Sequence, residues 1–557
     1  MKIALLYNKE NNFNELAKLI YKTFNRDIKT YLDIGFNIPV FMYDINQEFS
    51  IDEDIIISFI DDRFVIKQEK FLELYKKNKD KKKFIFISFT DNYSNIEEIR
   101  KLNFIDGTQD NKIIIREILY EIARYFFKTS KVKLFISYKR VDKDNTPIDK
   151  LREYIHKNSK IADFFDIYSI EYSEDFEEKI KEEIAPSIFV AFWTDNYTLS
   201  EVCKDEVILA KQHNIPIVTI NCLQNKDSIA FPYMFNNLVI NCNVDFEDTI
   251  KEILLEAVRF FNNKNRLENF KTIHSLEQFS TTAKRVEALD LLQYNKVLYP
   301  DPPIGKYERA LLKGEFITPN EFFSSLNLNK KIAISVSETN DFDNGVSIEH
   351  LQDIVVELVR FLLLSANNII YGGDIRYSLG LNFAEIIFNL AKKYATKKPA
   401  VINPLPSEYY KKLDDKIKAT YHNIIEFIDL GDDLSKMREA MAKIEDARVI
   451  IGGKTTNYKG KYPGVLEEAY YTLKANKPLY IIGAFGGVAK KIAQIKEGID
   501  IKEWQKFDIY ETIKKSPLNN GLSEEENRTL FYSKDIDEII KLLMKGLKNM
   551  KGDENEA

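Results

Sequence analysis

Residues 184–211 read IAPSIFVAFWTDNYTLSEVCKDEVILAK. The run Ser187–Trp193 is apolar after its first residue, and it has the length and the β-branched and aromatic content of a buried strand. A polar turn follows, and then a segment whose apolar residues recur at helical spacing. The stretch therefore predicts a buried strand followed by a helix, which is the repeating unit of parallel α/β sheets.

The same alternation extends on both sides of this stretch. We predict strands over Lys133–Ser137, residues 164–168, Ser187–Trp193 and residues 216–221, with helices between them. Short buried strands that alternate with helices predict a parallel sheet with helices on both faces. The expected fold class is therefore α/β, with a flavodoxin-like order of elements.

The N-terminal part of the chain repeats this pattern. IALLY at 3–7 matches LFISY at 134–138, SFIDDRF at 58–64 matches AFWTDNY at 191–197, and IREILYEIARYFF at 115–127 matches IKEILLEAVRFF at 250–261. The pairs occur in the same order, at an offset that changes only from 131 to 135 residues. We infer a tandem duplication, with residues 1–129 as the first copy and residues 130–265 as the second.

A second alternating pattern begins at Lys330. The preceding residues 266–329 hold Pro300, Pro302, Pro303 and Gly305 in close succession, and we expect a partly helical connector there. Beyond it, three strand-like runs end in paired glycines: NIIYGGD, ARVIIGGK and KPLYIIGAFGG. Glycines let backbone N–H groups approach phosphate at the start of a helix. Residues 330–550 therefore predict a Rossmann-like nucleotide-binding domain, although neither GxGxxG nor a P-loop fingerprint occurs there.

The composition excludes several classes of protein. Eighty basic and 86 acidic residues give a formal net charge of −6, which argues against a general nucleic-acid binder. Three cysteines without a CxxC pair and five scattered histidines predict neither a disulfide framework nor a metal site. The N-terminal apolar run is too short for a signal peptide, and no stretch reaches the roughly 20 apolar residues of a membrane helix. We therefore expect a cytoplasmic protein that binds neither nucleic acid nor membrane.

Four blocks of the second copy resemble those of Toll/interleukin-1 receptor (TIR) domains in order and spacing. They are KLFISYKR at 133–140, YSEDFEEKI at 172–180, residues 184–211 and IPIVTIN at 215–221. TIR domains of this kind cleave or cyclise NAD+ with a glutamate on the helix after the third strand, so the resemblance implies that NAD+ is the substrate and Glu206 the catalytic residue. No further cofactor is implied. The residues expected to flank the substrate are Tyr138, Lys139, Arg140, Phe176 and, at a strand end, Trp193.

A single carboxylate suits this chemistry. Breaking the nicotinamide–ribose bond generates an oxocarbenium-like sugar and expels a neutral leaving group, so no general acid is required. A carboxylate beside the ribose stabilises the positive charge that grows in the transition state. The first copy carries Glu73 at the position of Glu206, but its first strand runs into Asn8-Lys9-Glu10 in place of Lys-Arg. We therefore expect a degenerate TIR-like module that serves packing or assembly.

In the C-terminal half, YGGD at 371–374, MREAM at 437–441 and residues 452–469 resemble the SLOG superfamily, with its lysine decarboxylase-like and LOG members. An insert between Gly453 and Gly464 interrupts the LOG catalytic loop, so the resemblance implies binding of a phosphorylated nucleotide more than phosphoribohydrolase activity. The residues expected to contact this nucleotide are Gly372, Gly373, Arg376, Arg438, Gly452, Gly453, Lys454 and Glu468 or its neighbour Glu467.

TIR and SLOG domains in one chain resemble bacterial anti-phage systems. In these, a signalling nucleotide such as a cyclic ADP-ribose isomer binds the SLOG domain and activates the effector. We therefore expect a ligand-gated NAD+ nucleosidase that self-associates into an oligomer or filament. The alternatives are a TIR cyclase that makes a cyclic ADP-ribose messenger, a non-catalytic TIR/SLOG scaffold, and a LOG-like hydrolase that releases the base from AMP.

Overall fold

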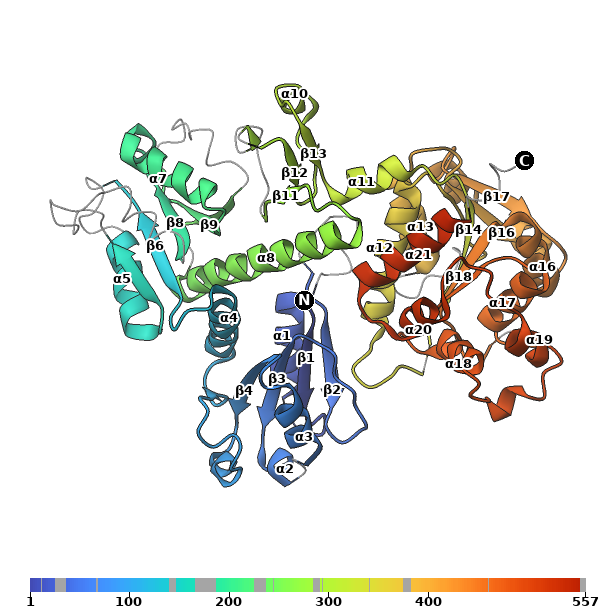
Figure 1. Ribbon diagram of the computed structural model, residues 1–557, viewed down its shortest axis with the longest axis horizontal. Coiled ribbons are helices and arrows are strands. Elements are labelled where there is room, and N and C mark those ends of the chain that lie inside the picture. Colours follow the sequence, from blue (N-terminus) through green and yellow to red (C-terminus); the bar gives the residue numbers. More distant parts are fainter. Residues whose placement is uncertain are drawn as a thin grey trace. The chain divides into compact units, whose positions relative to one another are not determined.

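The computed structural model describes the chain except for residues 12, 26–36, 67–68, 140–146, 166–186, 225–236, 244, 284–290, 293, 340, 374–381, 459 and 551–557. The described residues up to Pro319 belong to one compact unit, and those from Asn320 onward belong to another (Figure 1). The division falls within the stretch that the sequence indicates as a connector. The sheets of both units are parallel, which confirms the predicted α/β fold class.

The first sequence repeat forms a five-stranded sheet with the order β2-β1-β3-β4-β5. Its strands β1 and β3 are buried along their whole length, as is typical of parallel strands that helices cover on both faces. The strands are β1 (Ile3–Tyr7), β2 (Val40–Asp44), β3 (Ile55–Ile60), β4 (Lys83–Ser88) and β5 (Ile105–Asp106). The helices are α1 (Asn14–Phe24), α2 (Asp62–Ile66), α3 (Glu69–Asn78), the 3-10 helix η2 (Asp91–Asn95) and α4 (Asn111–Phe127).

The second repeat forms a sheet with the order β10-β9-β8-β6-β7. Read from its other edge, this order matches that of the first repeat and supports the duplication. The strands are β6 (Lys133–Ser137), β7 (Ala162–Phe165), β8 (Ser187–Trp193), β9 (Ile217–Asn221) and β10 (Leu238–Asn241). The helices are α5 (Pro147–Asn158), the 3-10 helix η5 (Tyr197–Leu199), α7 (Glu201–Gln212) and α8 (Phe246–Ile273). The strand predicted at 164–168 thus begins earlier, at Ala162, and residues 166–186 lie outside the described part.

Helices α4 and α8 join the two repeats along a seam. Near the start of both helices, Arg116 donates a hydrogen bond to Glu247 at 2.6 Å. Further along, the rings of Phe126 and Phe261 stack at a centroid distance of 5.2 Å. The contacts advance together along both helices, so α4 and α8 run parallel. The two phenylalanines occupy equivalent positions of the repeat, and the copies therefore meet through matching faces.

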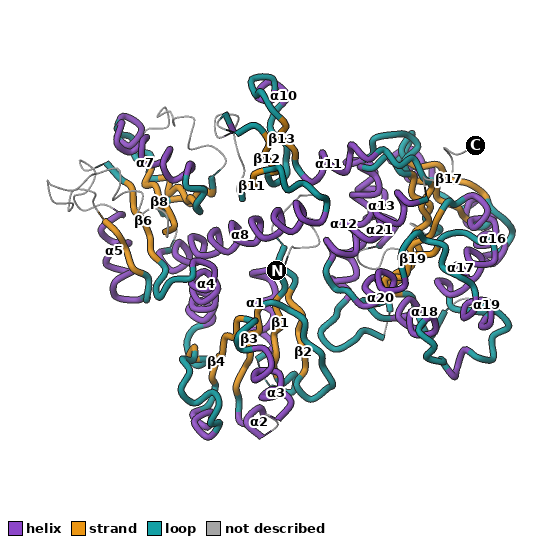
Figure 2. The backbone as a smooth tube through the Cα atoms, in the orientation of Figure 1, coloured by secondary structure: helices purple, strands orange, loops and turns teal. Residues whose placement is uncertain are grey.

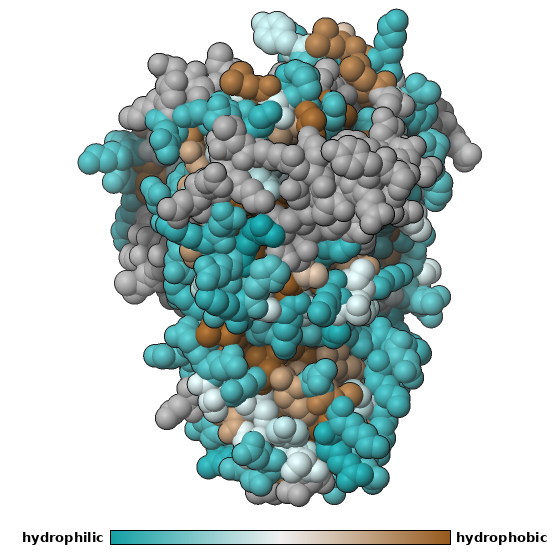
Figure 3. All heavy atoms as spheres, turned by 90° about the vertical axis from the view of Figure 1, so that its left-hand side faces the viewer, coloured by the Kyte–Doolittle hydropathy of each residue, from teal (hydrophilic) through white to brown (hydrophobic). Residues whose placement is uncertain are grey.

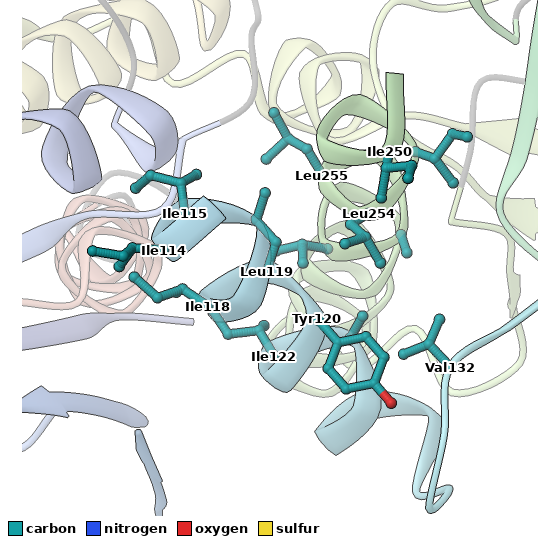
Figure 4. Packing of buried hydrophobic residues seen from close by; sticks show 14 of the residues in the cluster. Ile114, Ile115, Ile118, Leu119, Tyr120, Ile122, Val132, Ile250, Leu254 and Leu255 are labelled. Carbon is teal, nitrogen blue, oxygen red and sulfur yellow. The ribbon is translucent and has the colours of Figure 1, made fainter. Parts of the chain in front are cut away.

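Apolar side chains fill this seam. Figure 4 shows Leu119 of α4 beside Leu254 and Leu255 of α8, within one hydrophobic cluster that spans both repeats. All three leucines are buried. Burial of a leucine side chain contributes about 1.5–3 kcal/mol, so these contacts stabilise the pairing strongly. The two repeats therefore share a core.

The connector contains more strand than we predicted. It forms a small parallel sheet of β11 (Ser280–Thr281), β12 (Lys296–Leu298) and β13 (Glu315–Ile317). Strands of two or three residues are too short for a periodic hydrophobic signal, which is why the sequence pattern did not indicate them. In the described part of the connector, the expected helical content is present in the end of α8 and in the short helices α10 (Lys306–Arg309) and α11 (Pro319–Leu326).

The second unit is built on a six-stranded sheet with the order β17-β16-β15-β14-β18-β19. Successive strands extend outward from β14 in one direction and from β18 in the other, so the order reverses between these two strands. The strands are β14 (Lys331–Ser337), β15 (Asn368–Ile370), β16 (Val401–Leu405), β17 (Ile425–Asp429), β18 (Ala447–Gly452) and β19 (Leu479–Ile482). In open α/β sheets, such a switch point is where ligands bind.

Helices cover both faces of this sheet. Figure 2 shows α12, α13 and α21 on one side and α16, α17 and α19 on the other. The helices are α12 (Ile348–Leu364), α13 (Phe383–Tyr394), α14 (Ser407–Lys411), α15 (Asp415–Thr420), α16 (Leu434–Ile444), α17 (Gly464–Lys474), α18 (Gly487–Lys496), the 3-10 helix η7 (Lys502–Trp504), α19 (Tyr510–Lys515), α20 (Glu524–Tyr532) and α21 (Ile536–Asn549). Helix α12 is buried over most of its length, which explains its unusually apolar sequence.

The surface in Figure 3 is largely hydrophilic and carries smaller apolar patches. Large apolar side chains that stay well exposed include Leu199 at 76%, Leu311 at 72% and Tyr307 at 90%. Within the described residues, no helix has the length and apolar character needed to cross a bilayer.

Candidate functional site

Helix α7 carries the glutamate that the sequence predicts as catalytic. The side chain of Ser200 caps this helix by accepting a hydrogen bond from the backbone N–H of Cys203 at 3.4 Å. The buried residues of the helix are Cys203, Glu206, Val207 and Ala210. Their spacing defines one helical face, so Glu206 is turned toward the interior of the domain.

The Glu206 carboxylate lies at the carboxyl edge of β6. Glu206 is 6% exposed, and its Oε2 accepts a hydrogen bond from Oγ of Ser137 at 2.5 Å. Ser137 is the last residue of β6, and its Oγ also lies 2.7 Å from the hydroxyl of Tyr197. Parallel α/β sheets bind their ligands at this edge. The carboxylate is therefore buried at the end of the sheet that such folds use for chemistry.

Two other weakly acidic groups lie near Glu206, the hydroxyl of Tyr197 and the thiol of Cys203, and burial keeps both protonated. It raises the pKa of the Tyr197 hydroxyl well above its usual value and the pKa of the Cys203 thiol to about 11, and the charge of Glu206 adds to both shifts. Both groups therefore keep their protons at neutral pH. Cys203 is only 3% exposed and lacks the thiolate character of a nucleophile. The chemistry available to this cluster is that of a carboxylate.

Several glycines lie close together at the switch point of the second unit. The backbone N–H groups of Gly453 and Lys454 donate to the carbonyl and Oγ of Ser337, at 3.0 and 3.3 Å. Gly452 and Gly453 have φ values of +61° and +99°, a region that favours glycine. A Cβ on Gly487 would lie 2.4 Å from the carbonyl oxygen of Gly453. These glycines allow close packing between backbone segments. This packing alone accounts for glycine at these positions, and no ligand is needed to explain it.

The glycine pair after β15 has a different environment. A Cβ on Gly372 would lie 3.1 Å from the side chains of Met437 and Met441. The amide of Asn403, which is fully buried, donates to the carbonyl of Gly373 at 3.1 Å. The Asn403 Oδ1 atom has no hydrogen-bond partner within the described residues. Among the described residues, no donor therefore reaches this buried acceptor beside the glycine pair.

Arg438 and the two glutamates of α17 form an ionic network. The Arg438 Nη1 atom donates to Glu467 Oε2 at 2.5 Å, and Ser435 donates to the other oxygen of Glu467 at 2.5 Å. The Arg438 Nε atom lies 3.6 Å from Glu468, whose second oxygen accepts a hydrogen bond from Arg448 at 2.8 Å. Arg438 is thus neutralised, and an anionic ligand would compete with carboxylates for it.

Two family models match the chain. The model of the TIR domain matches residues 134–254, and that of SLOG cluster2 matches residues 326–432 and 400–513. The chain combines a TIR domain with a SLOG domain. The TIR match lies in the second repeat, and the SLOG match lies entirely in the second unit. No curated protein matches the chain.

Three of the residues predicted to flank the substrate lie at one edge of the TIR sheet. Tyr138 and Lys139 directly follow β6, and Trp193 ends the neighbouring strand β8. The indole N–H of Trp193 is buried and has no acceptor within the described part of the domain. The other two predicted residues lie outside the described residues: Arg140 and Phe176.

Arg448 belongs to the SLOG network but is not among the residues predicted from the sequence. It is fully buried in β18, where it donates to Ser335 and Thr472 at 2.7 Å each and pairs with Glu445. The sequence does contain a signal for it: an arginine at the start of the apolar run ARVIIGG. A charged residue inside such a strand is buried and therefore requires fixed partners. Among the predicted SLOG contacts, Arg376 lies outside the described residues.

Cys222 and Cys242 form a disulfide in the TIR domain, so the prediction of no disulfide is wrong. The two residues directly follow β9 and β10, which are paired in parallel, and their Cα atoms lie 5.0 Å apart. This strand pairing brings together two cysteines that are 20 residues apart in sequence. The backbone N–H of Cys222 donates to the carbonyl of Trp193 at 2.9 Å, so the disulfide lies beside the predicted substrate edge.

Proposed function

We propose that the chain is an NAD+ nucleosidase of anti-phage defence that a signalling nucleotide activates through the SLOG domain. The observation that supports this most is the Glu206 carboxylate, which is buried at the carboxyl edge of the TIR sheet and held there by Ser137. A solvated glutamate on the helix surface would be exposed, and this one is not. Its burial makes an electrostatic role possible, because water screens its charge little there.

In the proposed reaction, Glu206 faces the ribose that carries nicotinamide. The bond between the ribose and the pyridinium nitrogen breaks, its electron pair leaves with neutral nicotinamide, and positive charge develops on the sugar. The carboxylate stabilises this charge, and a water molecule then adds to the sugar carbon and releases one proton to the solvent to give ADP-ribose. Tyr138, Lys139 and Trp193 would hold the substrate at the same edge, together with Arg140 and Phe176.

The SLOG domain would supply the gate. Gly372, Gly373, Arg438 and Lys454 would bind a phosphorylated nucleotide such as a cyclic ADP-ribose isomer, with Arg438 exchanging its glutamate partners for phosphate. Such a ligand activates the enzyme only if it binds the active assembly more tightly than the resting form. We therefore propose that nucleotide binding favours a self-associated state in which the TIR site is complete.

The test is NAD+ turnover by the purified full-length chain across a panel of cyclic ADP-ribose isomers and cyclic oligonucleotides. We expect turnover to rise with one of them, and Glu206→Gln to lower it at least 100-fold while binding of that nucleotide is unchanged. The matched control is Glu73→Gln in the first repeat, which should leave turnover intact. Turnover that survives Glu206→Gln would falsify the assignment. Chromatography of the product separates a nucleosidase from a cyclase, and no loss of NAD+ under any condition would indicate a scaffold.

A further inference from the structure

The duplication provides an internal comparison for the surroundings of Glu206. In the first repeat, Leu6 of β1 pairs with Ser58 of β3, and in the TIR domain Ser137 of β6 pairs with Ala191 of β8. The sequence repeat SFIDDRF and AFWTDNY makes Ser58 and Ala191 equivalent. Leu6 is therefore the counterpart of Ser137.

The same comparison covers two more positions. Counted along the matching segments, Phe64 is the counterpart of Tyr197, and Glu73 is the counterpart of Glu206. Leu6 and Phe64 are buried and apolar, at 0% and 2% exposed, whereas Glu73 is exposed to solvent. The copy without the two hydroxyls thus keeps its glutamate outside, and the copy with both hydroxyls buries it.

The hydrogen bonds among Tyr197, Ser137 and Glu206 all point in one direction. An ionised carboxylate only accepts hydrogen bonds, and a hydroxyl has a single proton to donate. Ser137 gives its proton to Glu206 at 2.5 Å, so the 2.7 Å contact between Ser137 and Tyr197 requires Tyr197 to donate to Ser137. Tyr197 itself is fully buried. The result is a chain of two hydroxyls that ends on the carboxylate.

Such a chain fixes the carboxylate in one orientation. A buried carboxylate without donors pays a large desolvation cost and tends to turn toward water or to bind a proton. The hydroxyl chain supplies a donor to the Glu206 carboxylate, and it polarises each bond along its length. Ser137 ends β6, an inner strand of the sheet, and Tyr197 begins the short 3-10 helix η5 with its side chain fully buried, so packing holds both residues in place.

We propose, on the basis of the function proposed above, that Ser137 and Tyr197 are positioning residues that hold the Glu206 carboxylate against the ribose. They touch the carboxylate directly or through one another, and they need not touch the substrate. Their effect is on the reactive geometry of Glu206, so loss of either hydroxyl lowers kcat and leaves KM for NAD+ nearly unchanged.

The experiment measures kcat and KM for NAD+ in the full-length chain, with the nucleotide of the panel that gives the highest turnover. Ser137→Ala should lower kcat about 10- to 100-fold, as expected for loss of a hydrogen bond to a charged group, and Ser137→Thr should restore most of it. Tyr197→Phe should lower kcat less, because it acts through Ser137. Tyr197→Phe introduces the residue that the first repeat already buries at this position, so the fold should tolerate it.

Ser58→Ala is the matched control. It removes a fully buried hydroxyl from the first repeat and introduces the residue that the TIR domain has there, so kcat should not change. If Ser137→Ala and Tyr197→Phe keep the kcat of the parent chain while Glu206→Gln is inactive, the positioning role is wrong and the nucleosidase stands. If the parent chain does not consume NAD+, or if Glu206→Gln does, the proposed function fails and the positioning role fails with it.

Discussion

Arg116 of α4 and Glu247 of α8 form an ion pair of 2.6 Å in which the two side chains are only 6% and 10% exposed. The pair joins the first repeat to the TIR domain across their seam. Arg116 also contacts Glu117 at 3.0 Å, and Glu247 accepts a second hydrogen bond from Tyr154 at 2.7 Å. One arginine thus balances carboxylates from both copies.

Arg116→Ala should destabilise the first unit by about 3–5 kcal/mol, because it leaves Glu247 buried without its counter-charge. Thermal unfolding followed by circular dichroism would measure the loss. The double variant Arg116→Met with Glu247→Gln should recover part of it, since Glu247 then carries no charge and Glu117 keeps its ion pair with Lys160 at 3.1 Å. Lys112→Ala is the control: Lys112 pairs with Asp248 at 3.0 Å across the same seam but is exposed, so its loss should have little effect. Equal effects of the two single variants would contradict this interpretation.

Arg448→Met should destabilise the SLOG unit by a similar amount, about 3–5 kcal/mol. Its side chain and that of Glu445 are both fully buried, and Glu468 depends on it as well. Arg448→Lys should not restore stability, because a single ammonium group cannot reach partners on three sides. Urea unfolding monitored by tryptophan fluorescence measures the change. A lysine variant as stable as the parent chain would show that only the charge matters.

Lys496→Met should stabilise the SLOG unit at neutral pH. Burial lowers the pKa of Lys496 to about 8, so the folded state pays to keep this ammonium charged at pH 7. The pKa of Lys496 is lower in the folded chain than in the unfolded chain, so the unfolded chain binds more protons between about pH 8 and 10.5. The parent chain therefore gains stability as pH rises through that range. The advantage of Lys496→Met should therefore be largest at pH 7 and shrink by pH 10. An advantage that is constant with pH would show that the lysine is solvated.

Cys203 should resist alkylation in the folded chain. Its pKa of about 11 and its burial leave almost no accessible thiolate at pH 7.5. Iodoacetamide followed by mass spectrometry should leave Cys203 unmodified in buffer and modify it in urea. Rapid modification of the native protein would reopen a nucleophilic role for this thiol.

Much of the fold was predictable because it depends on local patterns. Lys133–Ser137 and Ser187–Trp193 have the predicted bounds, since each is a buried apolar run between polar turns. The candidate site was only partly predictable. The position of Glu206 follows from the motif, but its hydrogen bond with Ser137 joins residues 69 apart, and no periodicity reports such a contact. The disulfide between Cys222 and Cys242 was missed for the same reason.

The parallel seam between α4 and α8 has a consequence for how copies of this chain can meet. Because both partners of the seam are encoded in tandem, they find each other at a local concentration fixed by the polypeptide and independent of expression level. The face of α8 that packs on α4 is occupied in every molecule from the moment it folds. Contacts through which separate chains assemble must therefore use other surfaces, and dilution cannot separate the two repeats of one chain.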